Sequence, residues 1–117
     1  MSNIFVTAGV TAKSVTTTPL NLLSQSTEAF EAPMSRCTRW RLSVYSATAD
    51  ITVKIYVRVG ADANAGLVEL TSLRTTVTAG AAAVTIAGSG EIAQTIKIMG
   101  YTASGTATVS TSFDGGD

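Results

Sequence analysis

The strongest constraint on the fold is a two-residue alternation of apolar and polar side chains in two neighbouring segments. In residues 40–46, Trp40, Leu42 and Val44 alternate with polar residues. Residues 51–59 repeat the pattern with five apolar side chains: Ile51, Val53, Ile55, Val57 and Val59. This period is typical of a β-strand that buries one face, so we predict a strand in each segment.

The four residues between these segments, 47–50, have a length that suits a β-hairpin. If Ser46 pairs with Ile51, the apolar residues of both strands fall on one side of the hairpin. A shift of one residue would turn one apolar set towards solvent, so this register should be strongly favoured. We therefore expect a central hairpin from Trp40 to Val59.

Further strands are indicated at residues 4–7 and 13–18, which we expect to pair, and at 67–77, with a bulge near 71–72. A turn at 88–90 is expected to join a strand at 83–87 to one at 91–99, and 107–113 alternates again. Several short strands at this spacing are typical of an all-β fold. We predict an antiparallel β-sandwich of about eight strands with jelly-roll-like or immunoglobulin-like topology; a small barrel also fits the pattern.

The chain of 117 residues has the size of one domain, so we assign residues 1–117 to a single β-sandwich. The least regular stretch is 19–36, where a polar background holds Leu20, Leu22, Leu23, Phe30 and Met34. Three interpretations remain open for it: a crossing loop, a short helix near 26–30, or an irregular arm that reaches a neighbouring molecule.

Charge is scarce and balanced. Charged residues make up 14% of the chain, against roughly 25% in an average protein, and the formal net charge is zero. Low net charge favours association between molecules, whereas a general nucleic-acid binder needs a basic excess. No apolar run approaches the roughly 18 residues of a membrane-spanning helix. We expect protein partners, with no nucleic acid and no membrane.

Catalytic chemistry has few candidates in this composition. The chain has no histidine, which removes the serine and cysteine mechanisms that use a histidine base and the usual zinc sites. Its single cysteine, Cys37, is expected to be a small buried residue at the start of a strand. Residues 62–66 resemble a calcium loop briefly, but Leu67 and Leu73 stand where glycine and glutamate are needed. We expect no enzymatic activity, no catalytic residues, no cofactor and no metal.

The outer face of the predicted hairpin is the most informative surface. In the register above it carries six long side chains: Arg39, Arg41, Tyr45, Lys54, Tyr56 and Arg58. Arg39 would lie opposite Arg58, and like charges in that position are destabilising, which suggests an acidic cover. We predict a protein interface here, because Arg and Tyr are favoured at interfaces. A solvated strand face and a platform for single-stranded nucleic acid are the alternatives; Trp40 is expected in the core.

With its Ser-, Thr-, Ala- and Val-rich strands, its start Met1-Ser2-Asn3, the segment 40–59 and the terminal strand 106–113, the chain resembles a known family. It is similar to the small β-sandwich capsid decoration, or cement, proteins of tailed bacteriophages. The resemblance implies a homo-oligomer, for example a trimer, that sits on a capsid lattice. It carries over no functional residue.

From these observations we expect a virion structural protein that is made in the host cytoplasm and binds the outer capsid surface. It would stabilise the shell by bridging capsid subunits, with the major capsid protein or other virion proteins as partners. Another phage component, such as a tail, neck or fibre-base protein, is one alternative. A carbohydrate-binding β-sandwich module is the other, and it would need exposed aromatic residues on a concave face.

Overall fold

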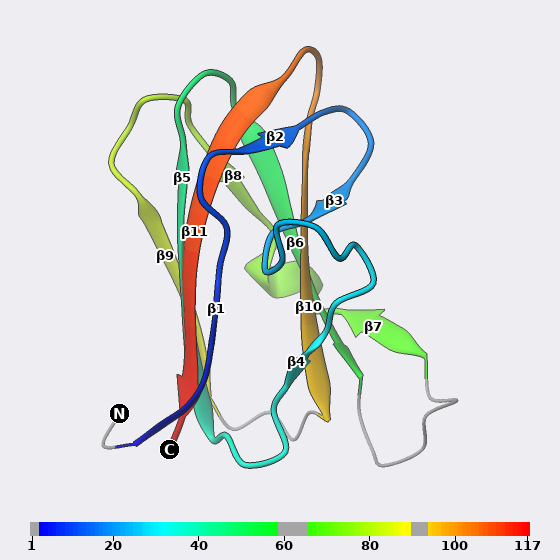
Figure 1. The fold of residues 1–117 in the computed structure, drawn as a ribbon, viewed down its shortest axis with the longest axis vertical. Helices are drawn as coiled ribbons and strands as arrows, with labels where there is room; N and C mark the ends of the chain where they lie inside the picture. The colour runs from blue at the N-terminus through cyan, green and yellow to red at the C-terminus, as the bar shows by residue number, and fades with distance from the viewer. Residues whose placement is uncertain (1–2, 59–65, 90–93) are drawn as a thin grey trace.

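The computed structural model describes residues 3–58, 66–89 and 94–117, and its strands form two antiparallel sheets packed face to face (Figure 1). One 3₁₀ turn, η1 (Thr71–Leu73), interrupts the strands. The strands are β1 (Ile4–Ala8), β2 (Lys13–Val15), β3 (Leu20–Asn21), β4 (Ala32–Pro33), β5 (Arg39–Ser46), β6 (Ile51–Arg58), β7 (Leu67–Glu69), β8 (Thr75–Val77), β9 (Val84–Ser89), β10 (Thr95–Thr102) and β11 (Ala107–Gly116). The predicted all-β sandwich is confirmed.

The strand order is that of a jelly roll. The first sheet runs β1-β11-β5-β9, with β2 following β1 along the same edge of β11. The second sheet runs β3-β10-β6-β7, with β4 beside β10 and β8 beside β6. When the three short pairs are counted as interrupted strands, the first strand pairs with the last, the second with the next to last, and so on inwards. That nested pairing is a long hairpin rolled into two sheets, and it selects the jelly roll over the immunoglobulin-like alternative.

The predicted central hairpin is wrong. β5 pairs with β11 and β9 in the first sheet, whereas β6 pairs with β10, β7 and β8 in the second. The connection between them crosses from one sheet to the other, and other segments hold both of its ends: Ala47 N–H donates to Thr108 O, and Asp50 Oδ1 accepts from Ala79 N–H. Alternation fixes only which face of a strand is buried, and two such faces can meet across a core as well as side by side.

Three other local predictions also differ from the structure. β1 and β2 do not pair with each other, because both line the edge of β11. The interruption in the segment 67–77 is the turn η1 instead of a bulge. β9 and β10 lie in different sheets, so they form no hairpin; the predicted turn residue Gly90 and residues 91–93 lie outside the described part, as do residues 59–65.

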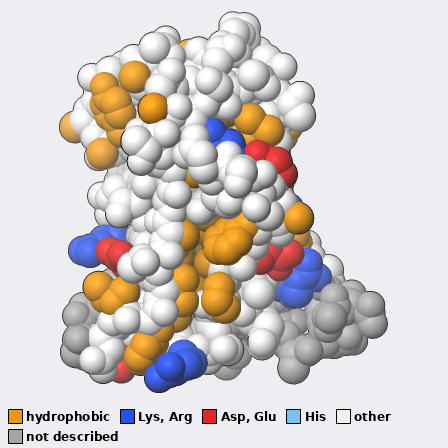
Figure 2. Space-filling view, in the orientation of Figure 1, with side chains coloured by type: hydrophobic (Ala, Val, Ile, Leu, Met, Phe, Trp, Pro, Cys, Tyr) orange, Lys and Arg blue, Asp and Glu red, His pale blue; other side chains and the backbone are white. Residues whose placement is uncertain are grey.

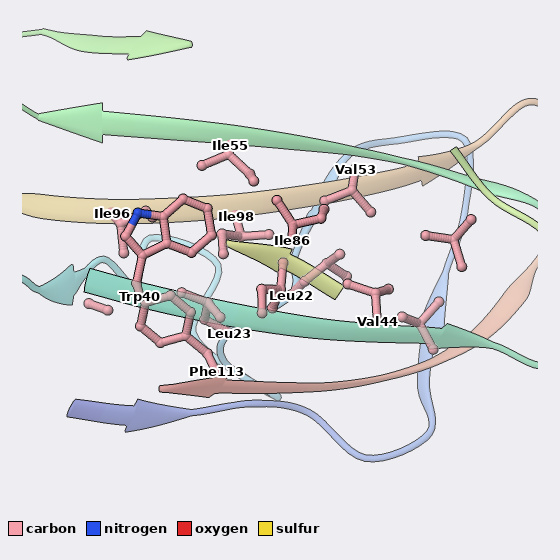
Figure 3. Close-up of a cluster of buried hydrophobic side chains, with 14 of the residues drawn as sticks. Leu22, Leu23, Trp40, Val44, Val53, Ile55, Ile86, Ile96, Ile98 and Phe113 are labelled. Carbon is pink, nitrogen blue, oxygen red and sulfur yellow. The ribbon is translucent and has the colours of Figure 1, made fainter. Parts of the chain in front are cut away.

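The core lies between the inner faces of the two sheets (Figure 3). Trp40 is 4% exposed and its ring stacks near Phe113, with centroids 6.1 Å apart, so its predicted core position is confirmed. Leu42 and Val44 of β5 face this core from the first sheet. The second sheet contributes the apolar side chains Ile51, Val53, Ile55, Val57, Ile96 and Ile98.

The segment 19–36 lies along the sandwich as a crossing loop that contains β3 and β4. Leu22 and Leu23 are buried, and the residues near 26–30 form a turn instead of a helix. The side chain of Lys13 is buried beneath the loop, where Nζ donates to Asn21 O at 2.8 Å, Ser24 O at 2.9 Å and Glu28 Oε1 at 2.7 Å. These contacts tie β2 of the first sheet to the loop around β3.

Candidate functional site

The six predicted interface residues lie on opposite outer surfaces of the sandwich. Arg39, Arg41 and Tyr45 point outwards from β5, because the alternate residues Trp40, Leu42 and Val44 are buried in the core. The other three, Lys54, Tyr56 and Arg58, point outwards from β6 in the second sheet. The structure therefore separates the single basic cluster into two groups of three. The predicted opposition of Arg39 and Arg58 does not occur, since it depended on the hairpin.

The outer surface of the first sheet, which we call the hydroxyl face, consists mostly of short side chains. Its members are Arg39, Arg41, Ser43, Tyr45, Thr85, Ala87, Ser89, Ser110, Ser112 and Asp114. Arg41 Nη2 lies 3.2 Å from Asp114 Oδ2, its neighbour across β5 and β11. A shallow hollow of about 450 Å³ lies at Arg39, Arg41 and the small residues of β9.

The outer surface of the second sheet, which we call the amphipathic face, carries longer side chains. Its members are Thr52, Lys54, Tyr56, Arg58, Leu67, Glu69, Thr95, Lys97, Met99 and Tyr101. Across β6 and β10 the neighbours are Lys54 with Met99 and Tyr56 with Lys97. Every outward residue of these two strands is half-buried, because the long side chains cover one another.

The sequence analysis missed Lys97, Met99 and Tyr101, which complete the amphipathic face. A signal for them was present: Ile96 and Ile98 share an inward face, and the alternate residues of a strand must then point outwards. They were not connected to Lys54 and Tyr56 because the partner of β6 was assigned to β5 instead of β10.

Two bidentate ion pairs flank the amphipathic face. Arg58 holds Glu31 through Nε at 3.1 Å and Nη2 at 3.0 Å, and the Thr95 hydroxyl also donates to Glu31. Arg74 holds Glu69 through Nε at 2.8 Å and Nη2 at 2.7 Å. The hydrogen bonds from the two arginines lower the pKa of each glutamate below its usual value, so both carboxylates are ionised at neutral pH.

The two lysines of this face have a different environment. Lys54 Nζ lies 5.3 Å from the centre of the Tyr101 ring, a cation–π contact. Within residues 3–58, 66–89 and 94–117, neither Lys54 nor Lys97 has a carboxylate within the 4.0 Å of an ion pair. Lys97 borders a hollow of about 230 Å³ whose other lining residues are Pro19, Tyr56, Leu67 and Met99. The face thus combines spare positive charge with an apolar depression.

A third surface is the open side between the sheets, where hydrophobic side chains gather between β1 and β4 (Figure 2). Ile4 is 55% exposed, and the Arg36 guanidinium lies 4.3 Å from the centre of the Phe5 ring. Cys37 lies nearby beside Gly115, half-buried rather than fully buried, and desolvation raises the pKa of its thiol. A raised pKa keeps this cysteine in its less reactive thiol form.

Among the described residues no three His, Cys, Asp or Glu side chains lie close enough together to hold a metal ion. The described part also contains no helix of the length and hydrophobicity needed to cross a membrane.

Comparison with known proteins finds no match to a protein-family model, to a curated protein sequence or to a solved structure.

Proposed function

We propose that this chain is a structural protein of a phage virion that binds the outer capsid surface and bridges neighbouring subunits. The supporting observation is the separation of the six candidate residues into two groups on opposite outer faces of one sandwich. A bridging protein needs two contact surfaces, and each face offers basic side chains and a tyrosine, residues that are favoured at interfaces. Many weak contacts of this kind can hold a lattice firmly through multivalency.

The fold agrees with this proposal without carrying it. Jelly rolls occur in viral capsid domains, but also in lectins and cupins, so the architecture alone does not choose a function. Trp40 does not support the carbohydrate-binding alternative, because it is buried beneath β9 and cannot stack on a sugar. The bridging role therefore depends on the two outer faces.

The first test is to purify particles of the virus that encodes the chain and measure its copy number by quantitative mass spectrometry. We expect a fixed, high copy number that falls when Arg39 and Arg41 are both changed to Gln, and also when Lys54 and Lys97 are. Absence of the chain from purified particles would overturn the proposal. Unchanged occupancy in both double variants would show that these faces do not make the contacts.

The second test is the mass of the purified chain in solution, measured by light scattering after size exclusion. We expect a symmetric homo-oligomer, with a trimer as the state implied by the resemblance. A monomer would remove the trimer from the proposal and leave bridging to single domains that contact a different subunit with each outer face.

A further inference from the structure

The hollow on the amphipathic face has the size and lining of a site for one apolar side chain. Its volume of about 230 Å³ is below the roughly 300–1,000 Å³ of pockets that enclose a whole small-molecule ligand. Pro19, Leu67 and Met99 provide apolar walls, and the Tyr56 ring provides another. Among the described residues that line it, Lys97 is the only charged one, so this part of the hollow is apolar with a positive rim.

The positive charge of this face is not neutralised within the described residues. The nearby glutamates are each held by another cation: Glu28 by Lys13 at 2.7 Å, Glu31 by Arg58 and Glu69 by Arg74. Lys54 and Lys97 form no ion pair within the described part, although Lys97 attracts Glu28 and Glu31, and Lys54 attracts Glu69, at longer range. Because three glutamates face five cations here, the group keeps an excess of two positive charges.

Their spacing suits two carboxylates on one extended segment. Lys97 lies opposite Tyr56 on β6, and Lys54 is two residues from Tyr56 on the same strand, so the lysines are diagonal neighbours. Diagonal pairs in a sheet lie roughly 7–8 Å apart. Alternate side chains of an extended peptide repeat at a similar distance, about 6.6 Å from the rise per residue. One strand can therefore present an acidic side chain to each lysine.

The lining favours a peptide over a nucleic acid. A single-strand platform stacks successive bases on open aromatic rings. Here the two tyrosines are separated along the face by the Lys54–Met99 pair, and the Lys54 ammonium lies over the Tyr101 ring. Methionine and tyrosine around an apolar depression instead match the composition of protein interfaces.

We infer that the amphipathic face is a docking site for an acidic, extended segment of a partner protein, with an apolar side chain in the hollow beside Met99. Carboxylates of the segment pair with Lys54 and Lys97. The inference rests on the proposed function only in taking a protein as the partner, and it adds the chemistry that the partner must have.

The test is an NMR titration of the full chain at low salt with the acetylated hexapeptide Asp-Ser-Asp-Ser-Leu-Ser, whose two carboxylates and leucine share one side when the peptide is extended. We expect shifts of the Met99 methyl and the Lys97 amide resonances. In the double variant Lys54→Gln, Lys97→Gln, which keeps an unbranched polar side chain and removes both charges, affinity should fall at least tenfold. The matched control is Arg39→Gln, Arg41→Gln on the hydroxyl face, which should bind the peptide as the wild type does.

Three results would overturn the inference: shifts that map to the hydroxyl face, equal binding of the matched basic peptide Lys-Ser-Lys-Ser-Leu-Ser, or equal or tighter binding of a thymidine hexanucleotide. An absence of shifts at millimolar peptide would do the same. The virion measurement is independent of this one. Peptide binding without the chain on particles would refute the virion role alone, and the reverse result would refute the docking site alone.

Discussion

The two outer faces of the sandwich are built on the same core but from different side chains. On the hydroxyl face, three of the four outward residues of β5 are exposed, and short Ser, Thr and Ala side chains surround them. On the amphipathic face all eight outward residues of β6 and β10 are half-buried, because Lys, Arg, Met and Tyr side chains cover one another. The inward positions of both sheets are apolar and fix the fold, whereas the outward positions are free to differ and so carry the distinction between the faces.

Two glycines, one in each sheet, differ in the kind of side chain packed against them, and this contrast predicts the largest effects. A Cβ at Gly88 in β9 would lie 2.3 Å from Trp40 Nε1, inside a rigid ring. A Cβ at Gly100 in β10 would lie 2.7 Å from Leu22 Cδ1, the end of a flexible side chain. We expect Gly88→Ala to lower the free energy of unfolding by about 3 kcal/mol and Gly100→Ala by about 1 kcal/mol.

Urea unfolding followed by circular dichroism measures both changes without relying on Trp40, whose environment the first variant alters. The internal control is Gly66→Ala, because no atom lies within 4 Å of a Cβ at Gly66. Equal costs for Gly88→Ala and Gly100→Ala would show that the two sheets relax equally, contrary to the contrast between ring and flexible side chain.

The second prediction concerns the hydrogen bonds of Lys13, which connect the two sheets at one end. Lys13→Met keeps much of the side-chain volume but removes three hydrogen bonds from the buried ammonium to Asn21 O, Ser24 O and Glu28. We expect a loss of about 2 kcal/mol, since Glu28 is half-exposed and can be rehydrated while the carbonyls lose a charged donor. Hydrogen exchange should become faster in residues 20–30 but not in β9; uniform acceleration would show that Lys13 does not act on this loop specifically.

Contacts between segments distant in sequence, such as those of Lys13, could not be predicted from the sequence. Alternation identified the strands and the buried face of β5 and β6 correctly, because burial of one face dictates the residue type at every second position. It could not identify the partner of each strand, since β5 against β6 and β5 against β11 bury the same residues. The six candidate residues were placed on one surface for that reason: Lys54 and Tyr56 were joined to Arg39 and Arg41 instead of to Lys97 and Met99. Lys13, which looked like an ordinary strand residue, is buried only because a loop distant in sequence covers it.

The Arg58–Glu31 pair beside the amphipathic face should make the free energy of unfolding sensitive to acid. Hydrogen bonds from Arg58 lower the folded-state pKa of Glu31 below its usual 4.5, so the unfolded chain takes up protons first as pH falls. The stability that Glu31 contributes is therefore complete above about pH 5 and is lost as pH falls through the lowered pKa. We expect Glu31→Gln to flatten the decline of unfolding free energy as the pH falls below about pH 5, measured by urea unfolding at each pH. A decline as steep as in the wild type would assign the acid sensitivity to other groups.

The smallest effect is expected at the corresponding ion pair of the hydroxyl face. Arg41 and Asp114 meet through one 3.2 Å contact, and the Arg41 side chain is 58% exposed. Water and salt screen such a pair, so Arg41→Ala should change the free energy of unfolding by no more than about 0.5 kcal/mol. A double-mutant cycle with Asp114→Ala gives the coupling, and the matched cycle of Arg58→Ala with Glu31→Ala should give a larger one, because that pair is bidentate and less exposed. If the Arg41 cycle gave the larger coupling, the hydroxyl face would be the more tightly organised surface. That result would contradict the view that the amphipathic face is preorganised for docking.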